Sequence, residues 1–219
     1  AIREAMRLHG AERVLLWVSI PCTGGCPWNR LNVAKSESAR AKVEAAIATM
    51  MVLWSNMVKV ANPLLAAGGK IAIEWPQACD YWNYASVRSF LAKWNLTSTL
   101  LHGCMFGLTS NQKRSKGVPI KKPWRIATNC IELRKRMNVV CGHSHGHARC
   151  EGSDTRMTEG YTCSFARAVH DAFNAYLHAL PSSVVERSAV VASGHSLLQP
   201  SSLSFCAMPC VDSEHPTMH

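Results

Sequence analysis

Two mostly apolar segments place the strongest constraint on how this chain of 219 residues can fold. Residues 12–20 (ERVLLWVSI) and 70–75 (KIAIEW) contain β-branched residues and Trp, and a proline follows each of them. Consecutive apolar positions of this kind are typical of strands that are buried on both faces of a sheet. Between them, residues 38–67 repeat apolar side chains at three- and four-residue spacing, which predicts a helix. A strand, a helix and a strand in this order predict two parallel, neighbouring strands.

Further elements are expected along the rest of the chain: a helix at 85–94, strands at 96–102 and 123–128, a short helix at 131–137 and an amphipathic helix at 164–180. This order predicts an α/β fold with a Rossmann-like sheet. The first three strands should be adjacent and parallel, and the fourth should be antiparallel to the third. The long helix should cover one face of the sheet and bury Met50 and Trp54.

The chain is expected to divide into three parts. Residues 1–138 would form the α/β domain, and residues 139–180 a His/Cys-rich loop followed by the amphipathic helix. Residues 181–219 are rich in Ser and Pro without periodicity, which predicts a disordered tail. No apolar run reaches about 18 residues, so no membrane-spanning helix is expected. The N-terminus has neither an initiator Met nor a signal-peptide pattern, which suggests a segment of a longer, intracellular protein.

Basic residues are concentrated in one part of the chain. Ten of them, against the single acid Glu132, lie between Gly103 and Cys150, in a chain whose net charge is +10. Such a block favours a polyanionic partner, nucleic acid first and DNA in particular as its expected form, because phosphates neutralised by Lys and Arg release counterions. The alternative is a solvated loop with no partner. The candidate phosphate contacts are Lys113, Arg114, Lys116, Lys121 and Lys122.

A short loop within this segment has the residues of a metal site. The sequence CGHSHGHARC, residues 141–150, offers several Cys and His ligands in ten positions. Cys141, His145, His147 and Cys150 could surround a Zn²⁺ ion if the loop folds sharply at Gly146. The alternative is a basic, glycine-containing surface loop that touches phosphates.

Short motifs lie where the predicted strands end or begin. A Ser-Ile-Pro-Cys motif ends in Cys22, an Ile-Glu-Trp-Pro motif contains Glu74, a Gly-Cys-Met-Phe-Gly turn follows the third strand, and a Lys-Pro-Trp-Arg motif ends in Arg125. In this order the motifs resemble those of the cytosine-C5 DNA methyltransferases, especially phage-like and mobile-element-like relatives. The resemblance covers roughly residues 12–130.

The resemblance implies a mechanism. A thiolate adds to C6 of a flipped cytosine while a carboxyl group holds N3, so Cys22 would be the nucleophile, Glu74 would contact N3 and Arg125 would help to bind the base. It also implies S-adenosylmethionine as the cofactor and a sheet equivalent to the C-terminal half of the methyltransferase fold. No glycine-rich cofactor motif precedes Cys22, so the chain would be a fragment or a degenerate member of the family.

Two other functions remain open. The first is a non-catalytic nucleic-acid-binding module of a mobile-element polyprotein, which would use the basic segment and the His/Cys loop. The second is a hydrolase in which a distant His activates Cys22, although no protease signature surrounds that residue.

Overall fold

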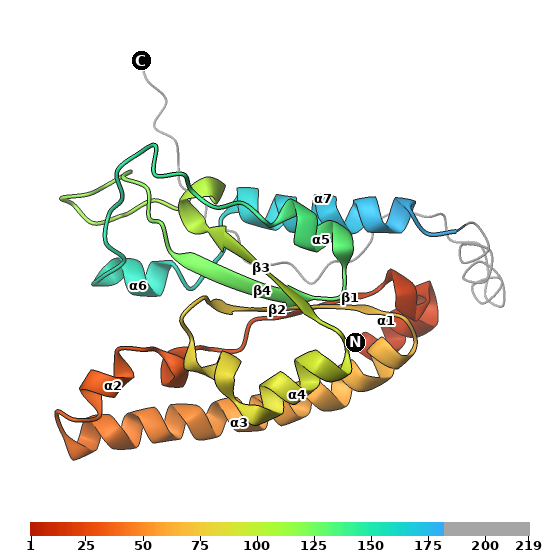
Figure 1. Ribbon diagram of the computed structural model, residues 1–219, viewed down its shortest axis with the longest axis horizontal. Helices are drawn as coiled ribbons and strands as arrows, with labels where there is room; N and C mark the ends of the chain where they lie inside the picture. The colour runs from red at the N-terminus through yellow and green to blue at the C-terminus, as the bar shows by residue number, and fades with distance from the viewer. Residues whose placement is uncertain (182–219) are drawn as a thin grey trace.

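A four-stranded mixed sheet forms the centre of the computed structural model, which describes residues 1–181 (Figure 1). The strands are β1 (Leu15–Val18), β2 (Lys70–Pro76), β3 (Thr97–His102) and β4 (Pro123–Thr128). Their order across the sheet is β1-β2-β4-β3, in which β1 and β2 are parallel and β4 is antiparallel to both of its neighbours. The chain is therefore mixed α/β, as the sequence predicts.

One expectation about the sheet is wrong. The third strand of the chain is not adjacent to the second, because β4 lies between β2 and β3. The residues of these strands explain the order. In β4 the last three residues, 126–128, are all buried, so that both faces are covered, whereas β3 begins with the exposed Thr97 and Ser98. A strand buried on both faces belongs at the centre of a sheet, and a polar strand belongs at its edge.

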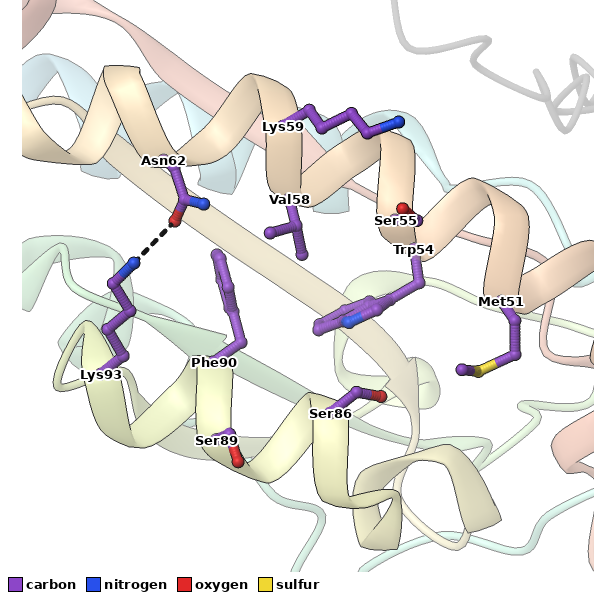
Figure 2. A pocket seen from close by; sticks show the side chains of 10 residues that line it. All are labelled: Met51, Trp54, Ser55, Val58, Lys59, Asn62, Ser86, Ser89, Phe90 and Lys93. Carbon is purple, nitrogen blue, oxygen red and sulfur yellow. Dashed lines mark hydrogen bonds between the residues drawn. The ribbon is translucent and has the colours of Figure 1, made fainter.

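Two helices cover one face of the sheet (Figure 1). The long helix α3 (Glu37–Ala66) is capped at its N-terminus by Ser36, whose hydroxyl accepts a hydrogen bond from the backbone N–H of Ala39. It buries Met50 and Trp54, as predicted, and α4 (Ala85–Lys93) packs beside it. Figure 2 shows the groove between the two helices, in which the Trp54 and Phe90 rings meet edge to face with centroids 5.5 Å apart. The groove is lined by the following residues: Met51, Trp54, Ser55, Val58, Lys59, Asn62, Ser86, Ser89, Phe90 and Lys93.

The other face of the sheet is covered by α5 (Ile131–Arg136) and α7 (Cys163–His178) (Figure 1). Helix α7 begins at Thr162, whose hydroxyl accepts a hydrogen bond from the Phe165 N–H. Its buried side chains, among them Phe165 and Phe173, share one core with Leu101 of β3 and Ile126 of β4. The amphipathic helix expected after the His/Cys loop thus packs directly on the sheet.

The remaining short elements lie around the sheet: α1 (Ile2–His9), α2 (Asn29–Asn32), α6 (Ser153–Met157) and the 3₁₀ turns η1 (Ala11–Arg13), η2 (Thr23–Gly25), η3 (Asp80–Asn83) and η4 (Gly103–Phe106). The tail expected to be disordered, residues 181–219, lies outside the described residues except for Pro181.

Helix α3 bears on the expectation that no helix crosses a membrane. Within residues 1–181 it alone is long and apolar enough to span one, with 11% of its most apolar window buried. Length and composition are weak grounds, because core helices of globular proteins meet the same criterion. Here α3 packs on β2 through its inner side chains.

Candidate metal centre and strand-end site

Four Cys and His side chains converge beside the carboxyl end of β3. Cys104 belongs to the η4 turn, and Cys141, His145 and His147 belong to the loop between α5 and α6. Their ligand atoms all lie within 4.8 Å of one another. The Sγ atom of Cys141 is 3.7 Å from Nε2 of His145 and 3.5 Å from Nε2 of His147. This Cys/His group could hold a metal ion.

The two Cys141–His distances agree with tetrahedral coordination. Zinc bonds of about 2.3 Å to sulfur and about 2.0–2.1 Å to nitrogen place a sulfur and a nitrogen ligand about 3.6 Å apart in a tetrahedron. The two measured Cys–His separations lie on either side of this value. The donor set of two thiols and two imidazoles is also one that zinc accepts in structural sites.

Backbone contacts fix the two loops that supply the ligands. The N–H of Gly103 donates to the Lys121 carbonyl at 2.7 Å, and an added Cβ at this glycine would lie 2.6 Å from Cδ2 of Leu108. Only glycine fits this close approach. On the other loop, the N–H of Cys141 donates to Nδ1 of His102 at 2.8 Å, which ties the ligand to the end of β3.

The electrostatic surroundings of His147 favour the neutral imidazole, which is the form that binds metals. Desolvation and the neighbouring His145, His143 and Lys121 lower the pKa of His147, which therefore stays neutral near neutral pH. Burial raises the pKa of Cys104, and the neighbouring Cys141 thiol raises it further. A bound cation opposes that shift, because it stabilises the thiolate.

The set of ligands differs from the predicted set at one position. Cys141, His145 and His147 come together as expected, but Cys150 does not join them. Its side chain is exposed, and its Sγ lies 3.3 Å from Oγ1 of Thr158. Cys104 is the fourth residue of the group instead. The contact with Thr158 holds Cys150 away from the group, whereas the η4 turn at the end of β3 holds Cys104 beside the loop.

The predicted catalytic carboxyl group, Glu74 of β2, is buried and hydrogen-bonded. Its Oε2 accepts a bond of 2.5 Å from the Tyr161 hydroxyl and one of 3.4 Å from the Ser19 hydroxyl. Burial raises the pKa of Glu74, and the Tyr161 hydrogen bond and the charge of Lys122 oppose this. The carboxyl group is therefore enclosed by polar partners on the α7 face of the sheet.

The predicted nucleophile, Cys22, lies in the turn after β1 and is half-buried. Burial raises the pKa of its thiol, and the carboxylate of Glu74 and the thiol of Cys26 add to the shift, while Lys122 opposes it. A thiol with a raised pKa is less ionised near neutral pH and hence a weaker nucleophile. The charge of Lys122 acts on both Cys22 and Glu74 and opposes the rise of each pKa.

The structure does not bring the three predicted catalytic residues onto one face of the sheet: Cys22 packs against the core on the α3/α4 side, and Arg125 lies on the other face from Glu74. Residues paired across a ladder share a face, and β2 pairs Glu74 with Ile126 but Trp75 with Arg125. Arg125 therefore lies on the α3/α4 face, opposite to Glu74. There its Nε donates to the Ser98 hydroxyl at 2.8 Å, and its guanidinium group lies 4.5 Å from the centroid of the Trp82 ring.

The five basic residues expected to contact phosphates fall into two groups. Three of them are exposed on the loop between β3 and β4: Lys113, Arg114 and Lys116. The other two are held by neighbours. Lys121 Nζ lies 3.1 Å from Nε2 of His143, and Lys122 donates to the carbonyl and the hydroxyl of Thr158.

A buried carboxylate anchors this basic loop. Asp154 accepts hydrogen bonds from the Ser110 hydroxyl at 2.5 Å, from the Asn111 N–H at 3.0 Å and from the Gln112 amide at 3.2 Å. Burial alone would raise the pKa of Asp154, but these hydrogen bonds outweigh it and hold the pKa below its usual value. The base of the loop is thus rigid, while its tip carries the exposed cations.

Comparison with protein-family models, with curated proteins and with solved structures found no match to this chain. The resemblance to the cytosine-C5 methyltransferases therefore depends on the quoted motifs alone.

Proposed function

We propose that this chain is a nucleic-acid-binding module whose basic loop is held in place by a zinc ion. The observation that carries the proposal is the convergence of Cys104, Cys141, His145 and His147 inside the most basic segment of the chain. Mixed thiol and imidazole donors favour zinc over magnesium or calcium, which prefer oxygen ligands.

The proposed role of zinc is structural. Four protein ligands fill a tetrahedral coordination shell, so no position is left for a water molecule or a substrate. Cys104 stands at the start of the loop between β3 and β4, and the other three ligands belong to the loop after α5. A shared ion would fix these two segments to each other and so define where the basic loop emerges.

Nucleic acid is the proposed partner because the loop combines exposed cations with a rigid base. Lys113, Arg114 and Lys116 are exposed, and Asp154 and its hydrogen bonds hold the residues that precede them. Phosphate contacts of this kind bind DNA without reading its sequence.

Metal content tests the first half of the proposal. We expect about one zinc per chain in protein purified without chelator, and loss of that zinc in Cys104→Ser. The matched control is Cys150→Ser, which removes a thiol from the sequence cluster but not from the four ligands, and it should retain zinc. Zinc binding that survives Cys104→Ser and fails in Cys150→Ser would refute the assignment.

Salt dependence tests the second half. Replacing Lys113, Arg114 and Lys116 together by Ala should weaken binding to DNA of any sequence and reduce the log–log salt slope by up to about 2.7. The control replaces three exposed lysines outside the loop: Lys35, Lys42 and Lys59. Equal effects of the two triple variants would mean that the basic loop has no special role.

A second candidate function is that of a methyltransferase-like domain acting on DNA cytosine through Cys22. It is supported by the parallel pairing of β1, which Cys22 follows by one turn, with β2, which contains Glu74, and by the charge of Lys122, which acts on both residues. The antiparallel strand inserted between β2 and β3 is compatible with the C-terminal half of a methyltransferase-like, Rossmann-like sheet. The cofactor S-adenosylmethionine enters by resemblance only, and no described residue is assigned to it.

The position of Arg125 changes which residue would serve this chemistry. Lys122, on the face of Glu74, would take the role that the resemblance gives to Arg125. A covalent adduct between the protein and an oligonucleotide that contains a mechanism-based cytosine analogue would support the function. It should disappear in Cys22→Ser and persist in Cys26→Ser. If the unmodified chain forms no adduct, the methyltransferase-like function is refuted and the non-catalytic nucleic-acid-binding module is the remaining proposal.

A further inference from the structure

A cavity of about 550 Å³ opens on the α4 face of the sheet, beside the start of β3. Two arginines, Arg88 of α4 and Arg125 of β4, line it, and no acidic residue does. The cavity shares no residue with the proposed zinc site and lies on the opposite face of the sheet from Glu74. It is therefore independent of both functions considered above.

Arg125 is a half-buried cation that lacks a carboxylate partner. The ion pairs found among residues 1–181 are Arg7–Glu4 and Arg30–Asp80, and neither involves Arg125. Its Nε donates to Ser98, which leaves the two terminal nitrogens of the guanidinium group for other acceptors. Burial lowers the pKa of Arg125, as expected for a charge that has lost solvent without gaining an anion.

The guanidinium group is held in a fixed orientation. Its carbon lies 4.5 Å from the centroid of the Trp82 ring, and the ring is itself fixed because Trp82 Nε1 donates to the Pro76 carbonyl at 3.0 Å. Stacking on Trp from one side and the Ser98 hydrogen bond from another restrict the arginine to one position. A preorganised guanidinium group binds an oxyanion with two parallel hydrogen bonds.

The remaining walls carry groups that a bare anion would not need. Asn83 and Asn95 bring side-chain amides, and Leu91 and Ala92 bring apolar surface. The backbone of Asn95 is left-handed, with φ at 50°, and Leu96 N–H donates to the Leu91 carbonyl at 2.9 Å, so this wall is a defined turn after α4.

From these features we infer that the cavity binds a nucleotide as a free small molecule. The phosphate group would lie between Arg88 and Arg125, the base would lie against Leu91 and Ala92, and the two asparagine amides would bond to its polar edge. The volume suits a ligand of this size, since small-molecule sites are about 300–1,000 Å³. Inorganic phosphate would use only the cationic part.

Calorimetric titration of the full chain with four probes tests the inference: AMP, CMP, cytidine and inorganic phosphate. We expect at least one nucleotide to bind about tenfold or more tightly than both cytidine and phosphate, because the nucleotide alone engages the arginines and the apolar wall. Equal binding of inorganic phosphate, or no binding of either nucleotide, would overturn the inference.

Two variants locate the site. Arg88→Gln and Arg125→Gln should each weaken nucleotide binding about tenfold or more, since each removes a charged hydrogen-bond donor. Lys93→Gln, on the same helix as Arg88 but outside the cavity, should have no effect. Arg88 is exposed and its replacement should not disturb folding, so it decides the test if Arg125→Gln unfolds.

A single-stranded oligonucleotide separates the free nucleotide from a DNA strand. If Arg88→Gln weakens the binding of the oligonucleotide but the mononucleotides do not bind, the cavity is a DNA contact and the inference fails. If mononucleotide binding is lost in Arg88→Gln while oligonucleotide binding is unchanged, the inference holds whether or not the basic loop binds DNA.

Discussion

Replacing Tyr161 by Phe removes the hydroxyl group that holds the buried carboxyl group of Glu74. That hydroxyl donates to Glu74 Oε2 at 2.5 Å and accepts from Trp17 Nε1 at 3.2 Å. The aromatic ring would remain, stacked on Phe165 with centroids 4.6 Å apart. The substitution therefore deletes polar contacts and leaves the packing of the core intact.

The loss can be estimated from these contacts. A hydrogen bond to a charged group contributes about 1.5–3 kcal/mol, and a buried acceptor left without its partner costs a similar amount. Glu74 would keep only the longer contact with Ser19, at 3.4 Å. We expect Tyr161→Phe to lower the free energy of unfolding by about 1.5–3 kcal/mol.

Urea denaturation at about pH 7.5, followed by circular dichroism, measures this difference. The matched control is Tyr84→Phe, because the Tyr84 hydroxyl makes no hydrogen bond among the contacts described for residues 1–181. Its effect should stay within about 0.5 kcal/mol. If both substitutions change stability equally, the Glu74–Tyr161 pair does not support the fold and the reasoning about the enclosed carboxyl group is wrong.

Three further outcomes are expected. Since burial raises the pKa of Glu74, wild-type stability should fall as pH rises above the usual value of 4.5, and Glu74→Gln should gain relative stability over that range in unfolding titrations. The lowered pKa of Asp154 has the opposite sign, so the stability lost in Asp154→Asn should be largest above about pH 4 and should shrink as the pH falls through the folded pKa. In thermal unfolding, Gly103→Ala should cost about 1–3 kcal/mol because its Cβ would meet Leu108, whereas Gly142→Ala, with nothing within 4 Å, should be neutral.

The elements of the fold were predictable where the signal is local. The apolar runs before Pro21 and Pro76 and the spacing of side chains around Trp54 identify β1, β2 and α3 from consecutive residues. The position of β4 within the sheet could not be predicted from neighbouring residues. It depends on contacts with distant segments, because Ile126 packs into the core on one face of the sheet and Ala127 into the core on the other. The sequence offered one clue that β3 forms the edge of the sheet: the strand begins with the polar residues Thr97 and Ser98, which are exposed in the structure.

The candidate site shows the same division. Three metal ligands lie within one short loop and could be found by spacing, but Cys104 reaches the cluster only because β3 ends there. Spacing within that loop therefore predicts Cys150 as the fourth ligand in place of Cys104. The pairing of Arg125 with Trp75 likewise depends on register, and a shift of one residue would have placed it on the face of Glu74.

The pairing of β4 with β3 also bears on the order in which the strands come together during folding. Strands β3 and β4 are joined by a connection shorter than the one through α3, so their antiparallel pair closes the smaller loop and should form first. Cys104 lies in that connection, and the other three ligands follow soon after β4. A metal ion bound there would stabilise the β3–β4 pair before β1 and β2 dock on it. Zinc would then accelerate folding and leave the unfolding rate nearly unchanged, which is the kinetic behaviour of an ion bound within the folding nucleus.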